Sequence, residues 1–286
     1  MKEIDDYIHM LEIDKAKRTI ELYGHSIKMF VEYFNIKTID ELNELKPGDV
    51  NSYQIFLKGK MNANSVNSYI RPLRCWARWL IDMEYIDKSP LARIKDLKIG
   101  KPLPVFLSDE EIEKMVNACN KVEDKLILTL LLTTGMRRNE LSTLKIKDIV
   151  GDRILINGKG NKQRSLLLQP EIAILLNGYI EDREKSGDTC EFAIVSQKGG
   201  QYSGEGIRLR IKALAKKAGL DPARIDKISP HKMRHTFATN LVSSGIDIKI
   251  IQEAMGHANI GTTASIYAHV TTSVMDRTML GQKGLL

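Results

Sequence analysis

A short segment rich in glycine, proline and lysine, DLKIGKPLPVFL, divides this 286-residue chain into two parts. It contains Gly100, Pro102 and Pro104 and has no helical or strand periodicity, which is typical of a linker between domains. Ser108 and Glu111 follow it with the spacing of a helix capping box, so a new folded unit begins there. The sequence therefore predicts a domain at 1–95, a linker at 96–107, a second domain at 108–271 and a C-terminal tail at 272–286.

The first predicted domain contains only helical patterns. Apolar residues recur at the helical period between Ile20 and Phe34, and a further long helix is expected at about 65–83. Pro72 lies inside that helix and should either kink it or mark a late start. From residue types alone, the basic face of this helix suits solvent as well as a polyanionic ligand. Its basic residues are Arg71, Arg74 and Arg78.

The second predicted domain is mostly helical with one small sheet. The apolar run DKLILTLLL indicates a buried helix that ends near Gly135, and further helices are expected at about 170–183 and 204–218. Two β-prone runs at 153–156 and 164–168 are joined by GKGNK, whose glycines permit a tight turn. This loop does not match the phosphate-binding pattern G-x-x-x-x-G-K-[ST]. The expected fold class is mainly α with a small β-sheet.

The composition favours a polyanionic partner and shows no metal-binding pattern. The formal net charge of +7 at pH 7 suits nucleic acid without proving it. The three cysteines have no C-x-x-C spacing, which argues for a reducing compartment and against disulfides and structural zinc. The N-terminus does not resemble a signal peptide, and no apolar run reaches the roughly 18 residues of a membrane span. We expect an intracellular protein with no membrane partner, no metal and no cofactor.

The segment 229–269 contains four of the six histidines of the chain. Ser229 suits a helix N-cap and a proline follows it, which predicts a helix over 230–244. Two histidines and an arginine share one face of this helix at spacings of three and four residues, and a histidine and a tyrosine follow a second predicted helix at 248–255. These side chains are His231, Arg234, His235, His257 and Tyr267.

Three interpretations compete for these histidines. A zinc site is the first, but the zincin motif needs a glutamate where Lys232 stands between His231 and His235. The second is that each histidine, taken singly, is an ordinary surface or core residue. The third is that the imidazoles and the arginine bind an anion, with the hydroxyl of Tyr267 as the nucleophile.

Four ordered motifs favour the third interpretation. The sequence GMRRNEL at 135–141 matches G-x-R-x-x-E-L, and GKGNKQR at 158–164 is a hairpin loop that carries lysine. H-x-x-R stands at 231–234, and G-H at 256–257 is followed by Tyr-x-His at 267–269. Together, over about 135 residues, these motifs make the chain resemble the tyrosine recombinases, the family of phage integrases and Xer proteins.

The resemblance implies a role for each matching residue. The C-terminal domain is then an α+β catalytic domain, and the N-terminal one is a SAM-like helical domain that clamps DNA from the opposite side. Glu140 would orient the first catalytic arginine, and Lys162 is the second choice for the catalytic lysine. The implied catalytic residues are Arg137, Lys159, His231, Arg234, His257 and Tyr267. The predicted DNA contacts are Arg71, Arg74, Arg78, Lys162 and Arg164.

The resemblance also implies the chemistry. Tyr267 would attack a phosphodiester and leave a 3′-phosphotyrosyl bond and a free 5′-hydroxyl. The two arginines and His257 would hold the phosphate oxygens, while His231 takes the tyrosine proton and Lys159 protonates the leaving oxygen. Because the ester conserves the phosphodiester energy, rejoining would need neither ATP nor a metal.

The biological role implied is site-specific recombination of double-stranded DNA through a Holliday junction in a homotetramer. The tail at 272–286 would dock on a neighbouring subunit, and the protein would act in the cytoplasm at the nucleoid. An Xer role in resolving chromosome or plasmid dimers, hence in chromosome partition and cell division, is our first expectation. His257 and Tyr267 are ten residues apart, one more than is typical of Xer proteins, so a phage or transposon integrase stays open. A non-catalytic DNA-binding protein and a type IB topoisomerase-like enzyme are further alternatives.

Overall fold

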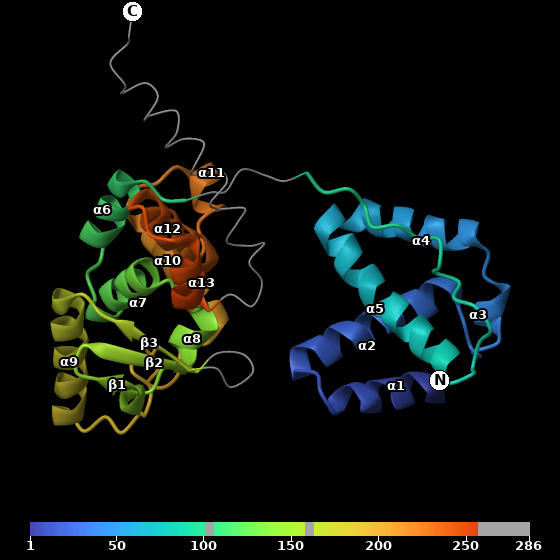
Figure 1. Cartoon of the computed structure of the whole chain (residues 1–286), viewed down its shortest axis with the longest axis horizontal. Coiled ribbons are helices and arrows are strands. Elements are labelled where there is room, and N and C mark those ends of the chain that lie inside the picture. Colours follow the sequence, from blue (N-terminus) through green and yellow to red (C-terminus); the bar gives the residue numbers. More distant parts are fainter. Residues whose placement is uncertain (101–105, 158–162, 257–286) are drawn as a thin grey trace, which may run out of the picture. The chain divides into compact units, whose positions relative to one another are not determined.

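The computed structural model describes residues 1–100, 106–157 and 163–256 of the chain. It divides into two compact units, Met1–Pro102 and Leu103–Leu286, each considered by itself below (Figure 1). The predictions that concern Lys159, Lys162, His257 and Tyr267, and the tail after them, lie outside the described residues.

The first unit is built from helices throughout its described regular elements. Their apolar faces enclose one core, in which Phe30, Tyr53 and Trp76 are almost completely buried. The longest helix carries Pro72 in its middle, buried, so the expectation of a late start at that residue is wrong. The elements are α1 (Lys2–Glu12), α2 (Lys17–Phe34), α3 (Glu41–Glu44), α4 (Pro47–Lys60) and α5 (Ala63–Asp82).

The chain that follows α5 folds back along this helix. The amide side chain of Asn67 donates to the carbonyl of Leu97 at 3.0 Å and accepts from its N–H at 2.8 Å. Asp96 accepts hydrogen bonds from Arg74 at 2.6 Å and from Arg71 at 3.3 Å. The first residues of the predicted linker are therefore held on α5 by side-chain contacts.

The second unit combines helices with a small antiparallel sheet. The Ser108 hydroxyl accepts from the N–H of Glu111, and the Glu111 carboxylate accepts from the N–H of Ser108. These two hydrogen bonds confirm the predicted capping box at the start of the first helix. The helices are α6 (Asp109–Asn117), α7 (Val122–Thr134), α8 (Arg138–Thr143), η1 (Ile146–Asp148, a 3-10 turn), α9 (Pro170–Lys185), α10 (Gly204–Lys217), α11 (Pro222–Ile225), α12 (Pro230–Ser243) and α13 (Ile248–Met255).

The sheet has the strand order β1 (Ile149–Val150), β2 (Arg153–Asn157) and β3 (Gln163–Leu167), with antiparallel neighbours. In its register, Ile154 pairs with Leu166 and Ile156 pairs with Arg164. Side chains alternate between the two faces of a strand, and Ile154, Ile156 and Leu166 face the core. The mostly helical fold with one small sheet confirms the predicted fold class.

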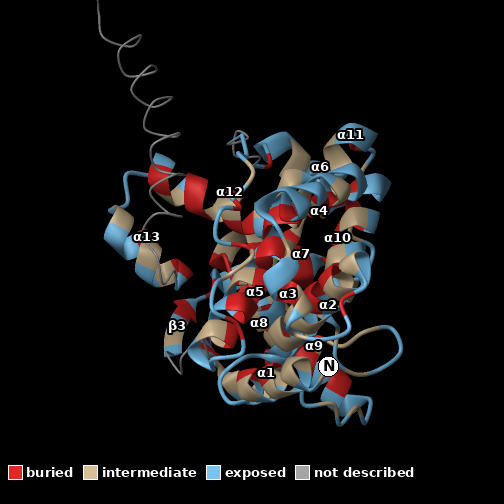
Figure 2. Cartoon of the chain, turned by 90° about the vertical axis from the view of Figure 1, so that its right-hand side faces the viewer, coloured by how far each residue is buried: buried red, intermediate tan, exposed pale blue. Residues whose placement is uncertain are grey.

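The centre of the second unit is α7, which is buried along most of its length and packs against α8, α9, α10 and α12 (Figure 2). The helix ends at Gly135 in the left-handed conformation, with φ of +60°. A Cβ at this position would overlap the ring of Phe237 on α12, so only glycine fits both the backbone and the packing. In the described ranges, no helix has the length and apolarity needed to cross a membrane.

Candidate active site

The predicted first arginine lies at the junction between α7 and α8. Arg137 is the N-cap residue of α8, two residues after the glycine that ends α7. Its backbone N–H donates to Oε2 of Glu140 at 2.7 Å, and its Nη1 donates to Oε1 of the same carboxylate at 2.8 Å. One carboxylate therefore holds both the backbone and the guanidinium of Arg137.

The predicted second arginine joins the ends of two helices. Arg234 on α12 is only 3% exposed. Its Nη1 donates to the carbonyl of Gly135 at 2.5 Å and its Nη2 to the carbonyl of Met255, the last residue of α13. The last carbonyls of a helix have no partner within it and carry partial negative charge, so a guanidinium is a favourable partner for them.

Arg137 reaches the same end of α13. Its Nη2 donates to the carbonyl of Gly256 at 2.7 Å. Gly256 is the left-handed C-cap of α13, with φ of +62°, and directly precedes the predicted His257. The structure thus brings together three of the predicted residues, Arg137, Arg234 and Glu140, from segments about a hundred residues apart.

A third guanidinium completes this cluster. Arg164 on β3 donates to Oε1 of Glu140 at 3.1 Å and to Oε2 at 2.8 Å. Its side chain is 13% exposed. Arg164 is one of the predicted DNA contacts; in the structure its guanidinium is directed into the protein toward Glu140, and its buried Nε has no partner among the described residues.

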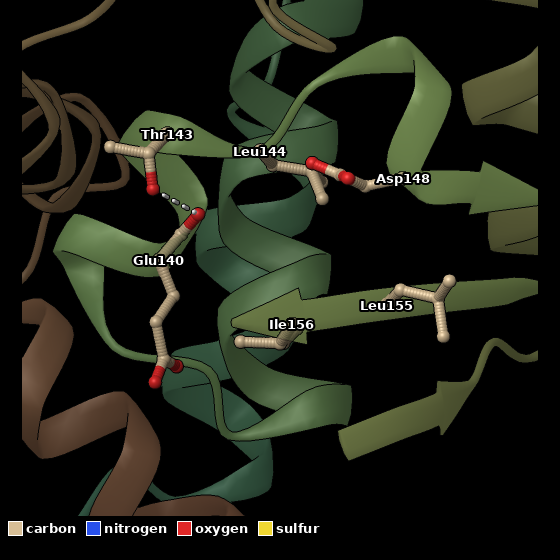
Figure 3. A pocket seen from close by; sticks show the side chains of 6 residues that line it. All are labelled: Glu140, Thr143, Leu144, Asp148, Leu155 and Ile156. Carbon is tan, nitrogen blue, oxygen red and sulfur yellow. Dashed lines mark hydrogen bonds between the residues drawn. The ribbon is translucent and has the colours of Figure 1, made fainter. Parts of the chain in front are cut away.

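Glu140 lies at the middle of the cluster. Figure 3 shows its carboxylate pointing away from Thr143, whose hydroxyl lies 3.4 Å from the backbone carbonyl of Glu140. Burial would raise the pKa of Glu140, but the Arg164 side chain and the Arg137 N–H outweigh it and hold this pKa below its usual value. The carboxylate therefore stays ionised at neutral pH.

The cluster carries an excess of positive charge. Burial, followed by repulsion from Arg137, lowers the pKa of Arg234 to about 9, so this guanidinium is still charged at pH 7. The cluster thus contains three guanidiniums and one carboxylate: Arg137 and Arg164 pair with Glu140, while Arg234 donates only to neutral carbonyls. A buried or half-buried cationic excess of this kind is suited to an anion.

His231 lies beside the arginines on α12. Its Nε2 is 3.1 Å from Nε2 of His235, one turn further along the helix, and the two rings meet edge to face. Desolvation, then the positive charges of Lys232, Arg234 and Arg137, lower the pKa of His231. A neutral imidazole at pH 7 can accept a proton, which a general base requires.

An open hollow of about 510 Å³ lies over this face. Four arginines and one histidine line it, together with the cap of α12. They are Arg137, Arg138, Arg208, His231 and Arg234. The hollow is therefore bordered by three of the predicted catalytic residues, Arg137, His231 and Arg234, and by the further cations Arg138 and Arg208.

The structure gives the three predicted DNA contacts of α5 different surroundings. Arg74 is half-buried, and both it and Arg71 pair with Asp96. Arg78 is exposed. The sequence prediction missed Asp96 because it fell in the predicted linker.

Within the described ranges, no group of three or more histidine, cysteine or acidic side chains is arranged to hold a metal ion.

The sequence could have revealed the position of Arg164. On β3 the buried positions alternate, so Arg164 shares a face with Leu166 and points inward. An arginine on the core face of a strand needs a buried carboxylate partner, and Glu140 in the preceding motif is one.

This arrangement, a helical domain with a small sheet and a cationic cluster at helix ends, belongs to a known class. The family model described as "Phage integrase family" matches residues 105–273, and the chain belongs to that family. More narrowly, it is a tyrosine recombinase, an enzyme that cleaves and rejoins DNA.

Relatives in sequence include Xer proteins. The tyrosine recombinase XerA of Pyrococcus horikoshii is 32% identical over 277 residues, which is 94% of this chain and 89% of the relative. The tyrosine recombinase XerC of Oceanobacillus iheyensis is 29% identical over 284 residues, covering 94% and 91%.

The solved structures that resemble this chain include DNA complexes. XerH bound to a palindromic difH substrate, in a post-cleavage complex, is 25% identical and has a TM-score of 0.73 over 91% of this chain and 78% of that one. The Tn1549 transposon integrase in complex with transposon right end DNA is 22% identical, with a TM-score of 0.75 over 96% and 98%, and supports the fold.

Proposed function

We propose that this chain is a site-specific recombinase of the Xer type, which acts on double-stranded DNA at a defined recombination site. The observation that carries the proposal is the convergence of Arg137 and Arg234 on the end of α13, beside the neutral His231 and under an open hollow. An excess of cations in such a place suits the scissile phosphate. The difH complex of XerH supports a specific DNA site as the partner.

The arginines would do the electrostatic part of the reaction. Arg137 and Arg234 hold the non-bridging phosphate oxygens, whose charge grows as the nucleophile attacks. By analogy with oxyanion stabilisation, each such donor contributes a factor of about 10² to 10³ in rate. Because helix carbonyls and Glu140 hold the two guanidiniums in place beforehand, little reorganisation is needed when DNA binds.

The covalent step uses residues beyond the described ranges. The Tyr267 oxygen attacks phosphorus, and the bond from phosphorus to the 5′ oxygen breaks. His231 takes the phenol proton, whose removal at pH 7 costs about 4 kcal/mol from a pKa near 10, and Lys159 gives a proton to the departing 5′ oxygen. His257 adds a donor to the phosphate. Attack by a 5′-hydroxyl of the second duplex reverses the step and releases the tyrosine.

Strand exchange by this route proceeds through a Holliday junction, with four subunits holding two duplexes. The tail at 272–286 would link neighbouring subunits in the tetramer. We keep the division into 1–95, 96–107 and 108–271 as the functional one, with Arg71, Arg74, Arg78 and Lys162 as DNA contacts. We propose resolution of chromosome or plasmid dimers at the nucleoid as its role; the likeness to XerC and XerA supports the Xer type of recombinase.

The direct test is a covalent protein–DNA adduct. The wild type is incubated with nicked duplexes carrying candidate sites from the source genome, without metal or ATP, and the products are separated under denaturing conditions. We expect an adduct with the wild type and with Tyr85→Phe, a matched loss of one exposed phenol in the first unit. We expect none with Tyr267→Phe. An adduct that survives in Tyr267→Phe would refute the assigned nucleophile, and binding without any adduct would favour a non-catalytic DNA-binding protein.

A second candidate is a mobile-element integrase with the same chemistry. The ten-residue spacing from His257 to Tyr267 favours it, and the fold likeness to the Tn1549 transposon integrase is compatible with it. The two roles differ in their substrates. Recombination between two copies of one site in a plasmid supports dimer resolution, whereas recombination only between two different sites supports integration. Relaxation of supercoiled DNA that carries no such site would instead indicate topoisomerase-like activity.

A further inference from the structure

Arg164 holds an inward position on β3 that needs an explanation. It pairs across the sheet with Ile156 and shares its face with Leu166, both of which are buried. Placing a guanidinium on a core face is costly unless its charge is matched by good hydrogen-bond geometry. Through Arg164, β3 adds a positive charge to the cluster around Glu140.

The contacts of Glu140 show what that charge accomplishes. Oε1 accepts from Nη1 of Arg137 at 2.8 Å and from Nη1 of Arg164 at 3.1 Å. Oε2 accepts from the Arg137 N–H at 2.7 Å and from Nη2 of Arg164 at 2.8 Å. A carboxylate has about four lone-pair sites, so these four bonds saturate it. Two of the four come from Arg164 in a bidentate pair, which sets the plane in which the carboxylate faces Arg137.

Arg164 also touches the second anchor of Arg137. A Cβ built on Gly256 would lie 2.9 Å from Nη1 of Arg164, so the guanidinium packs directly against this glycine. The carbonyl of Gly256 is the acceptor for Nη2 of Arg137. Arg164 therefore borders both groups that orient Arg137, the Glu140 carboxylate and Gly256.

We propose that Arg164 is a positioning residue for strand cleavage, which acts through Glu140 and Gly256 to hold Arg137 in the geometry that receives the scissile phosphate. The proposal rests on the catalytic role proposed for Arg137. It assigns Arg164 no direct contact with DNA, because Arg164 is not among the residues that line the hollow, whereas Arg137 and Arg234 are. A side chain at 256 would meet the Arg164 guanidinium, in addition to the strain of a left-handed backbone with φ of +62°.

The test compares cleavage and binding in three variants. Arg164→Met removes the charge, Arg164→Lys keeps the charge but not the bidentate geometry, and Arg210→Met is the matched control. Arg210 makes a comparable bidentate pair with Asp124 near the start of α7, at the other end of the helix from Gly135. The readouts are the adduct rate constant at saturating nicked DNA, the Kd with its salt dependence, and the thermal midpoint.

We expect Arg164→Met to slow adduct formation by about 10²-fold, as a displacement of about 1 Å in a positioned group does. Arg164→Lys should keep most of that defect, and the Kd and its salt slope should match the wild type in both. Arg210→Met should lower the thermal midpoint without slowing cleavage by the folded protein. If Arg164→Met does not fold, Arg164→Lys supplies the same comparison.

A double-mutant cycle decides whether Arg164 acts through Arg137. Adding Arg164→Met to Arg137→Ala should slow the reaction no further, because the residue being positioned is already absent. Wild-type cleavage rates in Arg164→Met or Arg164→Lys would overturn the proposal. So would multiplicative losses in the cycle, or a weaker Kd with a salt slope reduced by about one, which marks a direct phosphate contact. If the wild type itself forms no adduct, the proposed function fails first and this inference falls with it.

Discussion

Replacing Gly135 by alanine should destabilise the second unit by two separable effects. The backbone there has φ of +60°, which costs an alanine about 1–2 kcal/mol. The added Cβ would also overlap the ring of Phe237, and overpacking of a core costs about 1–3 kcal/mol. We therefore expect a total loss of about 2–5 kcal/mol in the free energy of unfolding.

Gly151 offers a matched control in the same unit. Its φ is +61°, almost the same as that of Gly135, but a Cβ there has no heavy atom within 4 Å among its described neighbours. Gly151→Ala should therefore lose only the backbone part, about 1–2 kcal/mol. The difference between the two variants measures the clash with Phe237 alone.

The assay is urea unfolding followed by far-UV circular dichroism. The chain has two tryptophans, Trp76 and Trp79, both on α5, so their fluorescence reports on the first unit and serves as an internal reference. Phe237→Leu in the Gly135→Ala background should recover part of the loss by giving the methyl group space. Equal losses in Gly135→Ala and Gly151→Ala would refute the steric argument.

Three further predictions concern pH, an ion pair and a helix cap. Because burial and neighbouring cations lower the pKa of His231, the rate of adduct formation should stay level as the pH falls through 6.5 and decline only at lower pH. Lys232→Met removes one of these cations, so the decline of the rate on the acid side should move to higher pH. Asp96→Asn should cost at most about 1 kcal/mol at pH 7, because the pair with Arg74 is solvent-screened. The Arg74 hydrogen bond lowers the pKa of Asp96 in the folded state. The difference in unfolding free energy between the wild type and Asp96→Asn should therefore be fully present above the pKa of Asp96 in the unfolded chain and vanish as the pH falls through its pKa in the folded protein. Urea titrations at several pH values measure this difference. Ser108→Ala should cost about 1 kcal/mol in the same assay, and no change would mean that the cap contributes nothing.

The sequence predicted best the features that depend on near neighbours. The cap at Ser108, the C-terminal glycines of α7 and α13, and the hairpin strands all follow from patterns within a few residues, and the structure has them where expected. The pairing of Glu140 with Arg137 is also local, three residues apart.

The sequence could not predict what holds Arg234. The partners of Arg234 are the backbone carbonyls of Gly135 and Met255. Every residue has a backbone carbonyl, so no pattern of residue types identifies these two as partners. The position of Asp96 was missed for another reason. It lies among glycines, prolines and lysines that read as a linker, yet the chain returns along α5 and places it against two arginines.

The anchoring of Arg234 also determines when the active-site arginines are fully held in place during synthesis of the chain. This side chain lies between the end of α7 and the end of α13, which are 120 residues apart along the chain, from Gly135 to Met255. A nascent chain from which α7 and α12 but not α13 have emerged lacks one anchor of each guanidinium, the carbonyl of Gly256 for Arg137 and that of Met255 for Arg234. We therefore expect a chain truncated before α13 to be unable to cleave DNA even where the core around α7 has folded.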